Sequence, residues 1–78
     1  MPTIARIGPY RVYFYSHDKQ EPPHVHVDRD DATAKFWLTP VALAYNIGFR
    51  ARELRDIQRV VSQRGVEFVE AWNDYFGT

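Results

Sequence analysis

The chain has 78 residues, with ten Lys and Arg against ten Asp and Glu, three His and no Cys. This length predicts one domain spanning residues 1–78, and the balanced charge gives no overall field that would attract nucleic acid or an anionic membrane. The lack of cysteine excludes disulfides, zinc–thiolate sites and thiol nucleophiles, and without a signal peptide or an apolar run of roughly 20 residues we expect a cytoplasmic protein that makes no membrane contact.

The first half of the chain predicts a β-meander. Short polar segments rich in Pro, Gly and Asp separate runs of β-branched and aromatic residues. The expected segments are a turn at 7–10, strands at 11–16, 24–29 and 32–38, a loop at 17–23, a tight turn at 30–31, and a short strand or an extended lead into the helices at 41–46. Connections of hairpin length favour an antiparallel sheet of three to four strands.

The second half changes to helical periodicity. Its apolar stripe consists of Leu54, Ile57, Val61, Phe68, Trp72 and Tyr75. One straight helix over residues 50–76 would be about 40 Å long, whereas a globule of this size has a radius of gyration of roughly 11 to 12 Å. We therefore expect a break near residues 62–66, giving two C-terminal helices or one kinked helix packed on one sheet face. The predicted fold class is α+β, and a single straight helix is the alternative.

Alternation along the strands predicts two different sheet faces. The apolar face, which the helices must cover, carries Val12, Phe14, Val25, Val27, Ala32, Ala34, Phe36 and Leu38. The opposite face carries Arg11, Tyr13, Tyr15, His24, His26, Asp28, Thr33, Lys35 and Trp37. Because no helix remains to cover this second face, its aromatic and histidine side chains indicate a binding surface in which Tyr13, Tyr15 and Trp37 contact a partner. The alternative is that the second copy in a homodimer, or the chain's own termini, cover it.

The two histidines of the stretch EPPHVHVDRDD carry the candidate chemistry. His24 and His26 lie two residues apart on one strand, so both imidazoles share a face and can share an ion. With His17 across the hairpin and Asp28 further along the strand, they predict a divalent metal site, zinc being one candidate. The same pair could instead be catalytic, acting as general acid and base on a phosphodiester. The plain alternative is a solvent-facing strand that happens to carry histidine.

A basic stripe marks the first half of the helical region. Arg52, Arg55 and Arg59 follow helical spacing on the side away from the apolar stripe. Such a stripe can contact phosphates, so nucleic acid is a candidate partner. The alternatives are charge complementarity with the acidic residues of the second helix, or a solvated face.

Several stretches together resemble the small bacterial domain-of-unknown-function family DUF4160, namely MPTIARI, PPHVHV, AKFWL, GFRARELRDIQRVV and EAWNDYFG. The resemblance covers nearly the whole chain, and Pro22, Pro23, His24 and His26 form its PPHxHV signature. It implies no established activity, catalytic residue or cofactor.

Genes of this family often lie beside another very small gene, so the resemblance implies one component of a toxin–antitoxin-like pair that binds a small cognate protein through the His and aromatic face. The alternative is a histidine-dependent ribonuclease or metal-dependent hydrolase that uses His24 and His26. Whether the chain is an enzyme stays open at this point. Family members often carry Ser where this chain has Arg50, which puts the helix cap there in doubt.

Overall fold

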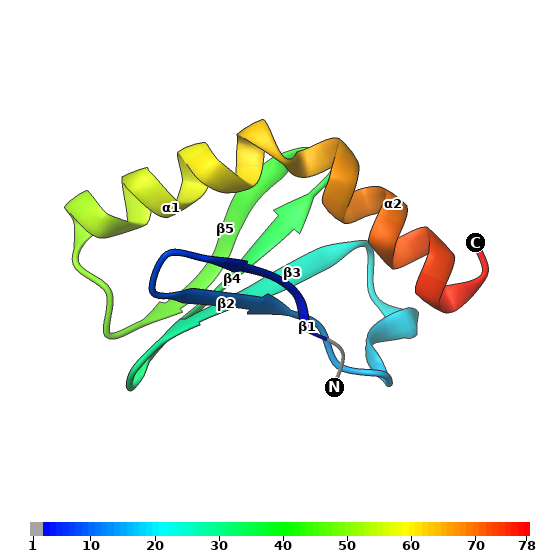
Figure 1. Ribbon diagram of the computed structural model, residues 1–78, viewed down its shortest axis with the longest axis horizontal. Coiled ribbons are helices and arrows are strands. Elements are labelled where there is room, and N and C mark those ends of the chain that lie inside the picture. The colour runs from blue at the N-terminus through cyan, green and yellow to red at the C-terminus, as the bar shows by residue number, and fades with distance from the viewer. Residues whose placement is uncertain (1–2) are drawn as a thin grey trace.

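The computed structural model describes residues 3–78 as a five-stranded antiparallel sheet followed by two helices (Figure 1). The elements are β1 (Thr3–Ile7), β2 (Tyr10–Tyr13), the 3-10 turn η1 (Asp18–Gln20), β3 (His24–Arg29), β4 (Ala32–Leu38), β5 (Val41–Ile47), α1 (Ala51–Gln63) and α2 (Gly65–Phe76). The strands lie side by side in chain order, so the sheet is a simple meander. This confirms the α+β class, and the radius of gyration is 11.5 Å.

The predicted count of three to four strands is too low. The sequence prediction missed β1, which pairs with β2 along one edge of the sheet. Its apolar residues Ile4 and Ile7 are three positions apart, and an irregular register between Thr3 and Ala5 disrupts simple alternation. Residues 41–47 form the full strand β5 at the other edge, whereas β2 ends at Tyr13, short of the predicted end at residue 16.

The pairing register confirms the two predicted faces. Val12 pairs with Val27, which pairs with Ala34, so these side chains share the apolar face. Tyr13 pairs with His26, which pairs with Lys35, and these residues share the opposite face, here called the open face. The hairpin between β3 and β4 turns at Asp30, which adopts a left-handed backbone with φ of 53°.

Both helices lie over the apolar face, as Figure 1 shows. The predicted break falls at Arg64, between Gln63 at the end of α1 and the start of α2. No side chain caps α1 at Arg50, whereas Gly77 ends α2 in a left-handed conformation and donates its N–H to the carbonyl of Asn73. The core between the layers contains Val12, Val25, Val27, Ala34, Phe36, Leu38, Phe49, Ile57, Val61 and Phe68.

Within residues 3–78, neither helix combines the length and the apolar character that crossing a membrane requires.

Candidate functional site

An internal segment of the chain covers part of the open face, whereas the sequence indicated a face free for a partner, with a second copy or the chain's termini as the alternative cover. Tyr13, His24 and His26 are 4%, 0% and 5% exposed. The connection between β2 and β3 covers this end of the sheet, and Trp72 of α2 lies against His24 with the ring centroids 4.9 Å apart. In this connection, Tyr15 places its ring 5.0 Å from the ring of His26. These three buried side chains are therefore not free to contact a partner in this conformation.

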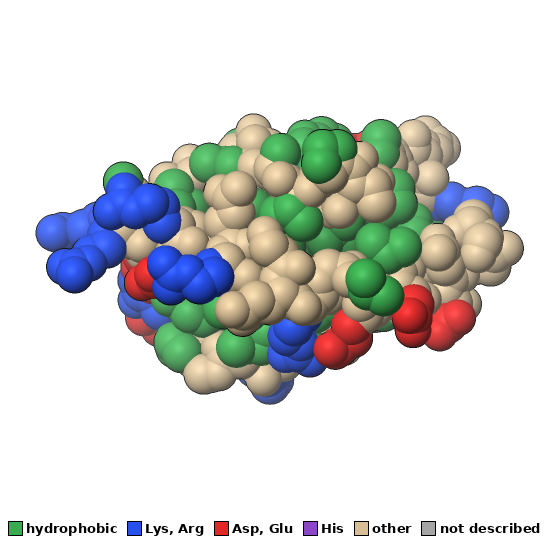
Figure 2. Space-filling model, turned by 90° about the horizontal axis from the view of Figure 1, so that it is seen from above, with side chains coloured by type: hydrophobic (Ala, Val, Ile, Leu, Met, Phe, Trp, Pro, Cys, Tyr) green, Lys and Arg blue, Asp and Glu red, His purple; other side chains and the backbone are tan. Residues whose placement is uncertain are grey.

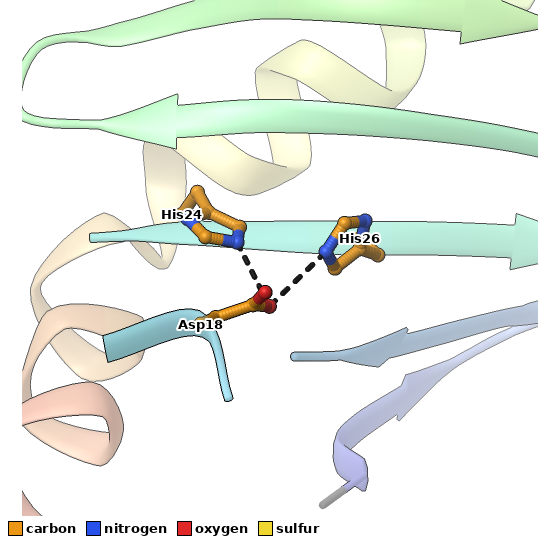
Figure 3. Close-up of side chains that lie close together, drawn as sticks. All are labelled: Asp18, His24 and His26. Atoms are coloured by element: carbon orange, nitrogen blue, oxygen red, sulfur yellow. Dashed lines mark hydrogen bonds and ion pairs between the residues drawn. The ribbon is translucent and has the colours of Figure 1, made fainter. Parts of the chain in front are cut away.

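The covering connection places Asp18 beside the two histidines (Figure 3). Asp18 is the first residue of η1 and is 5% exposed. Its Oδ2 atom lies 2.9 Å from Nε2 of His24 and 3.3 Å from Nε2 of His26. The same oxygen accepts the backbone N–H of Tyr15 at 2.8 Å. These contacts define the Asp18–His24–His26 cluster, which ties the connection to strand β3.

The prolines of EPPH orient the first histidine of the cluster. His24 Nδ1 lies 2.9 Å from the carbonyl oxygen of Pro22, which can only accept a hydrogen bond. This contact is a hydrogen bond when Nδ1 carries a proton and donates it. Nε2 of the same ring faces the Asp18 carboxylate, which also only accepts. Both contacts are satisfied together when a second proton on the ring, or another cation, lies between Nε2 and Asp18.

Electrostatics inside the cluster follow from burial and hydrogen bonding. Burial alone would raise the pKa of Asp18, but the Tyr15 N–H and the two imidazoles outweigh it, so that pKa is lowered and the carboxylate is ionised. For His26, burial is the largest effect and the neighbouring His24 adds to it, so the pKa of His26 is lowered although Asp18 opposes the shift. The cluster therefore combines an anionic oxygen with at least one neutral imidazole.

The other two residues of the predicted metal set lie outside the cluster. His17 is exposed and stacks its ring on Tyr15 with the centroids 5.3 Å apart. Asp28 accepts hydrogen bonds from the hydroxyl groups of Tyr13 and Thr33. Sequence reasoning missed Asp18 because the polar loop 17–23 also offers Glu21, and only the path of the loop shows which carboxylate turns inward. Glu21 instead pairs with Lys35.

A second candidate feature is the edge formed by β5. Leu43, Tyr45 and Ile47 are 42%, 43% and 60% exposed. Tyr45 and Ile47 pair with Lys35 and Thr33 and so lie on the open face, whereas Leu43 pairs with Phe36 and lies on the helix side. Apolar side chains thus flank this edge strand on both faces of the sheet.

The basic stripe lies on the exposed side of α1, the helix that follows β5 in the chain. Arg52, Arg55 and Arg59 are exposed, as expected from their spacing. Helix α1 follows β5 after a three-residue link and packs over it. Figure 2 shows Lys and Arg side chains gathered at the end of the molecule where α1 begins, and hydrophobic side chains across the middle of this side. Leu43, Tyr45, Ile47, Arg52, Arg55 and Arg59 together are called the β5 surface. Tyr15 and Trp37, predicted as contact residues, are partly buried and lie outside it.

Comparison with known proteins identifies a family. The sequence model of the family described as a domain of unknown function, DUF4160, matches residues 10–73 of the chain. This match spans β2 to most of α2 and includes the Asp18–His24–His26 cluster. No curated protein and no solved structure matches the chain.

Proposed function

This chain belongs to the DUF4160 family, and we propose that it is one component of a toxin–antitoxin-like pair that binds a small cognate protein along the β5 surface. The observation that carries the proposal is the unprotected edge strand β5. Within the described residues 3–78, β5 lies at the end of the sheet and pairs with β4 alone. Its seven residues, VALAYNI, contain no charge and no proline.

An exposed edge strand of this kind is rare without a partner. The outer backbone N–H and C=O groups of an edge strand can pair with another chain, and proteins usually block such edges with lysine, proline, short strands or a covering segment. The pairing of β5 with β4 has a register irregularity between Lys35 and Phe36 of β4. Strand β5 nevertheless keeps exposed apolar side chains on both sheet faces. An extended segment of a partner can add a strand here, with main-chain hydrogen bonds for affinity and Tyr45 and Ile47 for apolar contact.

The arginines of α1 indicate the charge of that partner. Arg52, Arg55 and Arg59 are exposed on the side of α1 away from its apolar stripe, and α1 begins three residues after the C-terminal end of β5. A partner that adds a strand to β5 and extends past its end over α1 would meet them with acidic side chains, which adds orientation and association rate more than affinity. The partner is therefore expected to be a small protein with an acidic segment next to an apolar strand.

Burial of the histidines argues against the enzymatic alternative. A general acid or base must come within hydrogen-bonding distance of its substrate. His24 and His26 are 0% and 5% exposed and already contact Asp18, so a phosphodiester has no path to either imidazole in this conformation. A binding module has the better support.

The proposal is tested by co-expressing the chain with the product of the small gene next to its own. Native mass spectrometry should show a complex of fixed stoichiometry. Calorimetry with the purified pair should show that Ile47→Lys and Arg55→Glu weaken binding, Ile47→Lys by at least about tenfold, which is about 1.4 kcal/mol. The matched controls are Val66→Lys, on a side chain 75% exposed on α2, and Arg6→Glu on the opposite edge strand β1, and both should bind like the unmodified chain.

Three outcomes contradict the proposal. The first is no complex with the neighbouring product, or equal weakening by Ile47→Lys and Val66→Lys. The second is a stable dimer of the chain alone that Ile47→Lys dissociates, which would assign the β5 surface to a second copy. The third is salt-sensitive RNA binding that Arg55→Glu abolishes, which would assign the arginines to phosphates.

A further inference from the structure

We infer that Asp18, His24 and His26 bind one divalent first-row transition-metal ion, with Zn²⁺ as the test ion. The donor set is two imidazole nitrogens and one carboxylate oxygen, a combination that suits Zn²⁺ and its neighbours in the first transition row. The inference concerns the interior of the open face and does not depend on what binds the β5 surface.

The spacing of the donor atoms fits one ion. Each of the three residues offers a ligand atom, and these atoms all lie within 4.8 Å of one another. Two ligands held about 2.0 to 2.1 Å from a tetrahedral zinc ion are themselves about 3.3 to 3.4 Å apart. The distances from Asp18 Oδ2 to the Nε2 atoms of His24 and His26 are 2.9 and 3.3 Å, so these two separations need to change by only a few tenths of an ångström. The ligand atoms of the two histidines lie no more than 4.8 Å apart and would move closer together around the ion.

The surrounding hydrogen bonds hold the ligands in the state that a metal requires. With its proton on Nδ1, His24 donates to the Pro22 carbonyl, which leaves the lone pair of Nε2 directed at the cluster. The backbone N–H of Tyr15 likewise holds the Asp18 carboxylate. Metal-bound histidines commonly donate their other ring N–H to a carbonyl in this way, and ligating carboxylates are commonly hydrogen-bonded.

A cation between Asp18 and His24 would also satisfy two acceptor atoms that face each other. With the proton on Nδ1, the Nε2 lone pair and the carboxylate oxygen face each other at 2.9 Å in a buried position. Either a second proton on His24 or a metal ion can neutralise this contact. The metal ion satisfies His26 as well, because its Nε2 points at the same oxygen.

Burial of the cluster indicates a structural role for the ion. The Asp18 and His26 side chains are each 6% exposed and that of His24 is 0% exposed, which leaves no surface for a large substrate. Three protein ligands leave one tetrahedral position, which a water molecule commonly fills at such sites. The ion would bind Asp18 of the connection and both histidines of β3 together, so metal binding would stabilise the closed connection and the fold.

The test uses the untagged chain, stripped with a chelator and then titrated with Zn²⁺ in calorimetry and thermal unfolding. One equivalent should bind and raise the unfolding temperature, and Co²⁺ should give the visible absorption of a tetrahedral site. Asp18→Asn and His26→Gln should each weaken binding by about 100-fold or more, a larger loss than the 10- to 100-fold typical of outer hydrogen-bond partners. His17→Gln is the matched control, because His17 is exposed and outside the cluster, and it should bind normally.

A measurement on the unmodified chain covers the case in which a variant fails to fold. The ¹⁵N resonances of Nε2 in His24 and His26 should shift on addition of one equivalent of Zn²⁺, while those of His17 stay in place. The inference is overturned by the absence of saturable one-to-one binding, by shifts confined to His17, or by Asp18→Asn binding Zn²⁺ as well as the unmodified chain does.

Discussion

One oxygen atom of Asp18 gives a quantitative prediction for the metal-free chain. Oδ2 accepts the Tyr15 N–H at 2.8 Å and also faces His24 Nε2 at 2.9 Å. In Asp18→Asn, the side chain has the same shape but places either an oxygen or an NH₂ group at this point. The NH₂ group satisfies a neutral His24 and leaves the Tyr15 N–H without an acceptor. The oxygen keeps the Tyr15 bond but removes the negative charge opposite His24.

Each placement therefore leaves one buried polar group unsatisfied, which costs about 1 to 3 kcal/mol. A chain of this length has a total stability of about 4 to 12 kcal/mol, so the loss is a sizeable fraction of it. Urea unfolding followed by circular dichroism in the presence of chelator measures the change. With a slope of about 1 kcal/mol/M, the midpoint should fall by about 1 to 3 M.

Asp31→Asn is the control, because Asp31 is an exposed carboxylate in the β3–β4 turn. It should change the free energy of unfolding by less than about 0.5 kcal/mol. If Asp18→Asn moves the urea midpoint no further than Asp31→Asn does, the hydrogen bonds assigned to the Asp18–His24–His26 cluster are wrong.

Three further predictions concern residues that stabilise the fold around the site. Phe14→Ala removes a fully buried ring that packs on the aromatic residues of α2, and should cost about 3 to 5 kcal/mol in chemical denaturation. Gly48→Ala should cost more than about 1 kcal/mol, and more than Gly8→Ala, in thermal unfolding. Gly48 has φ of +94° and an added Cβ would meet β4 atoms at 3.3 Å, whereas at Gly8 nothing lies within 4 Å. Tyr10 has a raised pKa, through burial first and then its hydrogen bond to Glu53, so its contribution to stability is complete below the ordinary Tyr pKa of about 10 and is lost as pH rises through the folded value. Stability measured from pH 9 to 11 should therefore fall less steeply in Tyr10→Phe, and an unchanged slope would contradict this assignment.

Local patterns in the sequence predicted the central part of the fold. The bounds of β3 and β4 agree with the predicted ranges 24–29 and 32–38, and the helix break is also confirmed. These features depend on neighbouring residues, because strand alternation and helical spacing each act over a few positions. The division into an apolar and an open face follows from the same alternation.

The sheet edges were less predictable. Strand β1 lies at the edge of the sheet, pairs with β2 and is only partly buried. Its sequence therefore shows weak alternation. The exposed apolar residues of β5 could be read from the sequence as strand residues, but their position at an unpaired edge is decided by the order of strands in the sheet.

The sequence by itself determined that His24 and His26 share a face of one strand, because side chains alternate along any strand. It did not determine that they are buried or that Asp18, and not His17 or Asp28, is their neighbour. Those facts depend on the path of the ten residues 14–23 over the sheet, which is decided by contacts between segments and not by local preference. The tertiary structure therefore decides that the two histidines of the His-x-His pattern form a buried cluster with one defined carboxylate.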